Sequence, residues 1–117
     1  MNTIFLSNIL ASLVPDNDGF VIRNEVNNEQ EYDSYVEFND SSEKPSWADV
    51  NGKIDDQQWV EVRASRNFRL SQSDWVMISD VPMAEERKAQ WQTYRQALRD
   101  ITTLPDPFNI NWPTPPE

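Results

Sequence analysis

An apolar stripe close to the carboxyl end constrains the fold of this chain more than any other feature. Ala84, Trp91 and Leu98 repeat every seven residues, and Tyr94 and Ile101 occupy the neighbouring position of the same pattern. On an α-helix this spacing gathers all five side chains on one broad face. The segment is therefore expected to be a helix that buries this face, either against another element or against a partner.

Flanking residues set the limits of this helix at about 82–101. Asp80 can cap its start, and Pro82 is tolerated in a first helical turn because the proline nitrogen needs no hydrogen-bond partner there. Glu85 and Glu86 lie near the positive end of the helix dipole, where acidic side chains stabilise a helix. We expect Asp80 to act as the capping residue.

The residues of the stripe and its flanks allow two interpretations. Trp91, Tyr94 and Leu98 can form a core face, or they can anchor in a groove of another protein, since Trp, Tyr and Arg are enriched among binding hot spots. Arg95 and Arg99 lie four residues apart on the same helix. They can pair with acidic side chains of the chain itself, or they can bind a carboxylate in a partner.

A second helix is expected before the stripe, because no Gly or Pro interrupts residues 54–81. Together the two helices would form a hairpin. Ser73, Asp74 and Trp75 fall near the junction and are expected to form a turn or cap, since Ser and Asp side chains accept hydrogen bonds from the free amides of a helix start. Asp74 is also a candidate ion-pair partner of Arg95 or Arg99, as are Asp80 and Asp100.

Five of the eight prolines follow the hairpin, at positions 105–116. Proline excludes helix and favours an extended chain, so an extended carboxyl-terminal arm is expected. The arm carries Phe108, Ile110 and Trp112. It can be disordered, or it can lie in a groove of its own domain or of a neighbour, because its prolines lower the entropy lost on binding.

The amino-terminal region, residues 1–40, is expected to combine a short helix with a two-stranded antiparallel ribbon. Apolar residues at spacings of three and four predict a helix over 3–13, which Pro15 ends. The β-prone runs 20–22 and 35–38 predict the two strands. The predicted fold class is therefore α+β, with the helical hairpin and its arm occupying residues 57–117.

Charge is distributed unevenly between the two halves. Residues 1–56 hold twelve acidic and three basic residues, a formal charge of −9, whereas the rest of the chain holds eight acidic and seven basic residues. Residues 41–56 are polar and are expected to form an acidic linker, in which Ser46 can cap a short turn beginning at Trp47. Neither half has the basic footprint of a nucleic-acid-binding protein.

Composition excludes most catalytic chemistry. The chain has no cysteine and no histidine, so thiol nucleophiles, imidazole bases and the usual zinc ligands are absent. Asp16 and Asp18 precede Gly19, but their spacing does not meet that of a calcium-binding loop. We therefore predict neither an enzyme nor a metal site or cofactor. The apolar residues of 4–14 are too few to span a membrane.

Three ordered sets of residues carry a resemblance to a known family. The first set is Arg63, Arg66, Asn67, Leu70 and Ser73-Asp74-Trp75, the second is Trp91-x-x-Tyr94-Arg95-Gln96-Ala97-Leu98-Arg99-Asp100, and the third is Asn111-Trp112-Pro113. In these residues the chain resembles the phage tail assembly chaperone family. This resemblance implies a small helper protein without a cofactor or a reaction, acting in the host cytoplasm while tails are assembled.

The resemblance also implies partners. A tail-fibre protein, expected to be a trimer, is the main one, and other tail or baseplate proteins are further candidates. We predict that the fibre binds an aromatic and basic set of residues: Trp91, Tyr94, Arg95, Leu98, Arg99, Phe108, Ile110 and Trp112. Two alternatives remain open, a structural virion protein retained at the fibre tip or baseplate, and a host-directed inhibitor that mimics nucleic acid through its acidic half.

Overall fold

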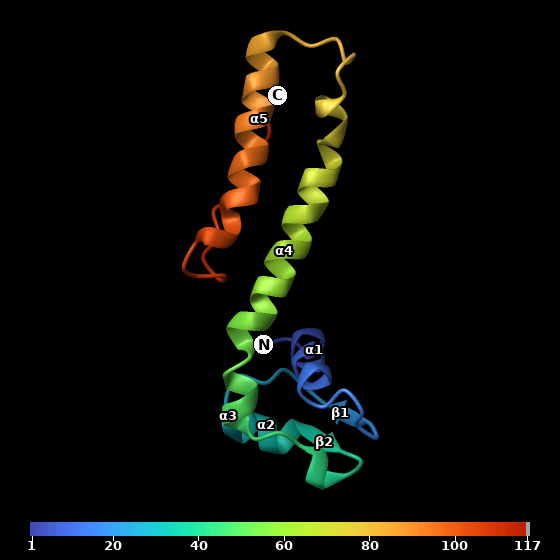
Figure 1. Ribbon diagram of the computed structural model, residues 1–117. Coiled ribbons are helices and arrows are strands. Elements are labelled where there is room, and N and C mark those ends of the chain that lie inside the picture. The colour runs from blue at the N-terminus through green and yellow to red at the C-terminus, as the bar shows by residue number, and fades with distance from the viewer. Residues whose placement is uncertain (117) are drawn as a thin grey trace. The chain divides into compact units, whose positions relative to one another are not determined.

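The computed structural model describes residues 1–116, whose helices and strands are shown in Figure 1. They group into two compact units, Met1–Gln57 and the residues from Gln58 onward. The elements are α1 (Thr3–Leu13), β1 (Phe20–Ile22), α2 (Glu29–Tyr35), β2 (Val36–Phe38), η1 (Ser41–Glu43), α3 (Trp47–Asn51), α4 (Ile54–Gln72), η2 (Asp74–Met77), α5 (Glu85–Arg99) and η3 (Asp100–Thr103). The expected α+β class is confirmed, with more helix than the sequence analysis predicted.

Helix α1 supplies much of the core of the first unit. Its amino end is capped by Asn2, whose side-chain oxygen accepts a hydrogen bond from the amide of Phe5 at 2.7 Å. Four of its apolar residues, Phe5, Leu6, Ile9 and Leu10, recur at helical spacing on one face and are buried. The buried core of the unit consists of Phe5, Leu6, Ile9, Leu10, Val26, Tyr32, Val36, Phe38 and Val50. The predicted limits of this helix are confirmed.

The two-stranded antiparallel ribbon is also confirmed. Phe20 lies opposite Phe38, and Ile22 lies opposite Val36. The two phenylalanine rings stack with their centroids 5.0 Å apart. Gly19 precedes β1 with a φ angle of +117°, a conformation that side chains with a Cβ atom rarely adopt. Glycine at this position therefore allows the chain to enter the ribbon.

The sequence analysis did not predict helix α2, and Tyr35, which was expected to begin a strand, is its last residue. Asn28 caps α2 by accepting a hydrogen bond from the amide of Glu31 at 2.8 Å. Tyr32 is buried, and its hydroxyl donates to the carbonyl of Pro45 at 2.7 Å. Burial, reinforced by the charges of Asp33 and Asp49, raises the pKa of Tyr32 to about 12.

Residues 41–56, expected to form an acidic linker, contain η1, α3 and the first turn of α4, and they belong to the first unit. As predicted, Ser46 caps the helix that begins at Trp47, accepting a hydrogen bond from the amide of Asp49 at 3.2 Å. Val50 is fully buried in the core of the first unit. The buried Val50 side chain and the Ser46 cap therefore hold this polar segment against the core of the first unit.

The second unit is built on the expected helical hairpin, in which α4 and α5 run side by side (Figure 1). The amino end of α5 corrects one expectation: the capping position is Ala84, and no side chain caps it. Asp80 lies exposed, several residues earlier. Pro82 disfavours helical geometry at Val81, residues 82–84 are also non-helical, and Asp80 therefore lies too far from the first turn of α5 to cap it.

Candidate partner-binding surface

The carboxyl-terminal arm, residues 105–116, lies against its own hairpin. Near its start, the Gln58 side chain donates a hydrogen bond to the carbonyl of Pro107 at 3.3 Å. Farther along, the guanidinium of Arg69 lies 4.4 Å from the centre of the Trp112 ring, a cation–π contact. Trp112 also packs against the core of this unit. The arm therefore follows α4 from its first turns towards its carboxyl end.

Three residues of the apolar stripe form the core of the second unit, the first of the two interpretations that the sequence allowed, whereas Ala84 precedes α5 and is exposed. Trp91, Tyr94 and Leu98 are buried together with Val76. The Trp91 ring meets the rings of Trp75 and Tyr94 edge-on, at centroid distances of 5.9 and 5.7 Å. Edge-to-face pairs of this kind stabilise a core beyond their buried area. Whether these side chains also contribute to partner binding stays a prediction.

Arg95 joins α5 to the end of α4. One of its terminal nitrogens donates to the carbonyl of Leu70 at 2.8 Å and to the hydroxyl of Ser73 at 2.7 Å, and the other lies 3.0 Å from the Asp74 carboxylate. The Arg95 side chain is only 12% exposed. Of the three acidic residues considered as partners, Asp74 forms the ion pair with Arg95. The guanidinium of Arg95 therefore makes its contacts within its own unit.

Two of the predicted turn residues have roles that differ from capping. Ser73 stands at the capping position of η2, but its side chain makes no capping hydrogen bond. Its buried hydroxyl instead donates to the carbonyl of Leu70 at 3.1 Å while accepting from Arg95. Trp75 is about half exposed and contacts Trp91. The three residues 73–75 do form the turn after α4, held there by Arg95.

Arg99 differs from Arg95 although it follows one helical turn later. It is exposed, and its guanidinium donates to the side-chain oxygen of Gln96 at 3.0 and 3.3 Å. Phe108 of the arm is likewise exposed, whereas Ile110 and Trp112 are partly buried. Among the predicted partner-binding residues, Arg99 and Phe108 are thus directly accessible.

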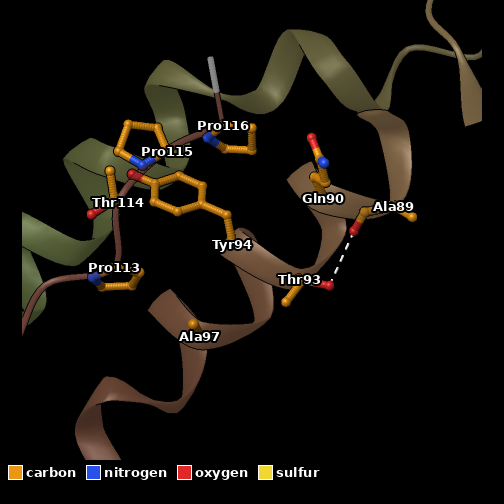
Figure 2. Close-up of a pocket in the computed structure, with 9 residues that line it drawn as sticks. All are labelled: Ala89, Gln90, Thr93, Tyr94, Ala97, Pro113, Thr114, Pro115 and Pro116. Carbon is orange, nitrogen blue, oxygen red and sulfur yellow. Dashed lines mark hydrogen bonds between the residues drawn. The ribbon is translucent and has the colours of Figure 1, made fainter. Parts of the chain in front are cut away.

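A groove of about 770 Å³ lies between α5 and the end of the arm (Figure 2). One wall is the α5 face that carries Ala89, Thr93 and Ala97, residues four apart with small side chains. The opposite wall is residues 113–116 of the arm, and the Tyr94 ring points towards them. The Thr93 hydroxyl donates a hydrogen bond to the carbonyl of Ala89 at 3.1 Å and is not available to a ligand as a donor. The groove is therefore lined largely by carbon.

The sequence analysis missed most of this groove. Ala89, Thr93 and Ala97 are small, and their spacing of four is the signal that could have found them, since it places them on one helix face. Only Tyr94 belongs both to the groove and to the predicted binding set. Within residues 1–116, no three acidic side chains gather closely enough to hold a metal ion.

Comparison with known families bears on the second unit. A family model described as phage tail assembly chaperone protein matches residues 59–117, just over half of the chain. The chain belongs to the phage tail assembly chaperone family. The match confirms the resemblance seen in the sequence, and it includes the arm and both walls of the groove. The family is one of assembly chaperones rather than of enzymes.

The remaining comparisons add no further relatives: no curated protein and no solved structure matches the chain. In the part of the chain that the structure describes, no helix combines the length and apolar character needed to cross a membrane. Membership of this family means that the protein acts in the assembly of phage tails, and it implies binding to tail proteins.

Proposed function

We propose that this phage tail assembly chaperone binds a tail-fibre protein through the groove between α5 and the arm. The observation that carries the proposal is the groove itself, with a wall of small α5 side chains facing prolines within the region that the family model matches. An extended fibre segment bound there would meet a largely apolar surface. Arg99 is exposed on another face of α5 and would pair with a carboxylate of the fibre outside the groove.

Fibre assembly explains why such a groove would be useful. A fibre trimer must bring three chains into register, and until then its apolar surfaces and strand edges are prone to wrong pairing. A helper in the host cytoplasm that covers one such segment would keep it from aggregating. The buried residues Trp91 and Leu98 would act indirectly in this process, by fixing the position of α5.

The test is co-expression with the tail-fibre protein of the same phage, followed by size exclusion with light scattering. Thr93→Trp would fill the groove, and Gln92→Trp adds the same bulk at an exposed neighbour outside it. We expect the chain to raise the yield of fibre trimers, and Thr93→Trp to lower that yield at least about tenfold while Gln92→Trp does not. Equal yields with both variants would overturn the proposal.

The same experiment separates a departing chaperone from a retained virion protein. Trimers that elute without the chain indicate a chaperone that leaves, whereas stable co-elution indicates a subunit that stays in the tail. Mass spectrometry of purified particles gives an independent reading, because a retained subunit is present in a fixed ratio to the fibre protein.

A further inference from the structure

We infer that the first unit holds a separate binding site, at the open edge of β1, for an extended apolar and basic segment of another protein. The segment would add to the ribbon as a third strand. This site goes beyond the proposed function, because Phe20, Ile22 and the α1 residues beside them all lie outside the region that the family model matches.

Backbone geometry identifies the open edge. The amide of Asn39 donates to the carbonyl of Gly19, and the amide of Arg23 donates to the carbonyl of Tyr35, both at 2.9 Å. In an antiparallel ladder, hydrogen-bonded and non-hydrogen-bonded residue pairs alternate. The backbone amide and carbonyl of Val21 therefore also point towards β2. The amides and carbonyls of Phe20 and Ile22 therefore point away from the ribbon. No hydrogen bond within residues 1–116 satisfies them.

The outer edge of β2 differs, because the chain covers it. The amide of Val36 donates to the carbonyl of Tyr32, which closes the end of α2. The Lys44 ammonium donates to the carbonyl of Val36 at 2.8 Å. A covering lysine is a common means of protecting a strand edge from unwanted pairing. No comparable cover is present on β1 in the described chain.

A groove of about 340 Å³ adjoins the open edge. It is lined by Thr3, Ile4, Ser7, Asn8, Phe20 and Ile22. Ile4 is 73% exposed, an unusual position for a large apolar side chain on a helix whose other face forms the core. An added strand would pair its backbone with Phe20 and Ile22, and alternate side chains would reach Ile4. This combination is the arrangement used in β-strand addition.

The negative charge of the first unit indicates which kind of segment would bind at the edge of β1. The first unit carries twelve acidic and three basic residues, and Asp16 and Asp18 lie just before β1. An incoming segment with Lys or Arg at alternate positions is therefore attracted, and an acidic one is repelled. The same charge opposes pairing between the edges of two copies of this chain. We therefore assign the site to a basic partner segment rather than to a second copy.

The test uses the full chain labelled with ¹⁵N and a blocked peptide of alternating lysine and valine. We expect amide exchange of Phe20 and Ile22 to slow by roughly tenfold at saturation, while Val21, already paired with β2, stays unchanged. A peptide of alternating glutamate and valine should not bind. Binding without protection of Phe20 and Ile22, or equal binding of the acidic peptide, would overturn the inference, as would a dimer of the chain formed through β1.

Two variants separate groove filling from loss of the fold. Asn8→Trp places a bulky ring in the groove, whereas Ala11→Trp places it on an exposed position of α1 that does not line the groove. Asn8→Trp is expected to weaken binding of the lysine peptide at least about tenfold, with Ala11→Trp binding as the unmodified chain does. Equal affinities of the two variants would contradict the site.

Discussion

Arg95 shows how a single side chain can define the shape of the second unit. Its guanidinium satisfies the carbonyl of Leu70 near the end of α4, fixes the hydroxyl of Ser73 and pairs with Asp74. A fork of several donors suits this task, and the single ammonium of lysine does not match it. The contacts hold the turn after α4 against the middle of α5. Arg95 thus acts mainly by linking α5 to the turn after α4 within the unit.

Removing the hydrogen bonds and the ion pair of Arg95 should destabilise the second unit measurably. We expect Arg95→Ala to lower the free energy of unfolding by about 2 kcal/mol, because hydrogen bonds to a partly buried charged group are lost. Arg99→Ala is the matched control, since Arg99 is exposed, and should change stability by less than about 0.5 kcal/mol. Urea unfolding followed by tryptophan fluorescence measures both. Equal effects would mean that Arg95 contributes nothing specific.

Tyr32 should make the first unit sensitive to alkaline pH. Its pKa is raised in the folded chain to about 12 from an ordinary value of 10.0, mainly by burial. Unfolding then favours loss of the proton, so stability is fully present below pH 10.0 and falls as the pH rises towards 12. Tyr32→Phe should remove this tyrosine's part of the decline and, at neutral pH, cost about 1 kcal/mol for the lost hydrogen bond to Pro45.

The measurement is urea unfolding followed by circular dichroism at neutral pH and at stepped alkaline pH. Tyr35→Phe is a suitable control, because Tyr35 lies in the same helix and is less buried than Tyr32. A decline that is identical in the Tyr32→Phe variant would show that other groups cause it.

At the scale of elements, the arm completes the hairpin. Trp112 packs on the core of the second unit beneath Arg69, whereas Phe108, four residues earlier, is 55% exposed. We expect Trp112→Ala to cost about 2 kcal/mol of stability and Phe108→Ala less than about 0.5 kcal/mol. Thermal unfolding by circular dichroism compares the two variants. A larger loss from Phe108→Ala would contradict the observed course of the arm.

Gly19 determines how the chain enters β1. A Cβ atom there would lie 2.7 Å from the side-chain nitrogen of Asn39, and the φ of +117° would be strained. Gly19→Ala should therefore destabilise the first unit by about 1–2 kcal/mol. Gly52→Ala is the control: Gly52 has an ordinary helical φ of −69°, so alanine is expected to be neutral or slightly stabilising. Urea titration of both variants distinguishes strain from a general effect of alanine.

Periodic elements were predictable, and short capped helices were not. The limits of α1 follow from apolar spacing and from Pro15, and the two strands of the ribbon follow from short β-prone runs. Helix α2 carries little apolar periodicity and depends on its amino-terminal hydrogen bonds, in which the Asn28 side chain accepts from the amide of Glu31 and the Glu31 carboxylate accepts from the amide of Asn27. Asparagine followed three residues later by glutamate was a usable signal for this helix.

The candidate site was harder to predict than the fold, for a physical reason. Large aromatic side chains predict burial and binding equally well, since both remove apolar area from water. Trp91 and Leu98 lie in the core, while the groove is lined by alanines, Thr93 and prolines that carry little signal in a sequence. A cavity depends on where the arm lies against α5, and that position is set by contacts such as Arg69 with Trp112.

At the scale of the whole molecule, the two units differ in charge as well as in architecture. The first unit carries −9 of the total −10, and most of its acidic side chains are exposed. Net charge far from zero limits self-association through mutual repulsion between molecules. The family match falls on the second unit, with its groove and balanced charge. We therefore interpret the first unit as the source of repulsion between copies of the chain.

This interpretation predicts that neutralising exposed acids of the first unit lowers solubility without unfolding it. Asp16, Glu25 and Asp33 are exposed, and their carboxylates form no hydrogen bond or ion pair with residues 1–116. Asp16→Asn, Glu25→Gln and Asp33→Asn together bring the formal charge from −10 to −7, so precipitation should begin at a lower polyethylene glycol concentration. The charge-conserving set Asp16→Glu, Glu25→Asp and Asp33→Glu should precipitate as the unmodified chain does. If all three proteins precipitate together while their melting temperatures agree, repulsion by the first unit does not limit association.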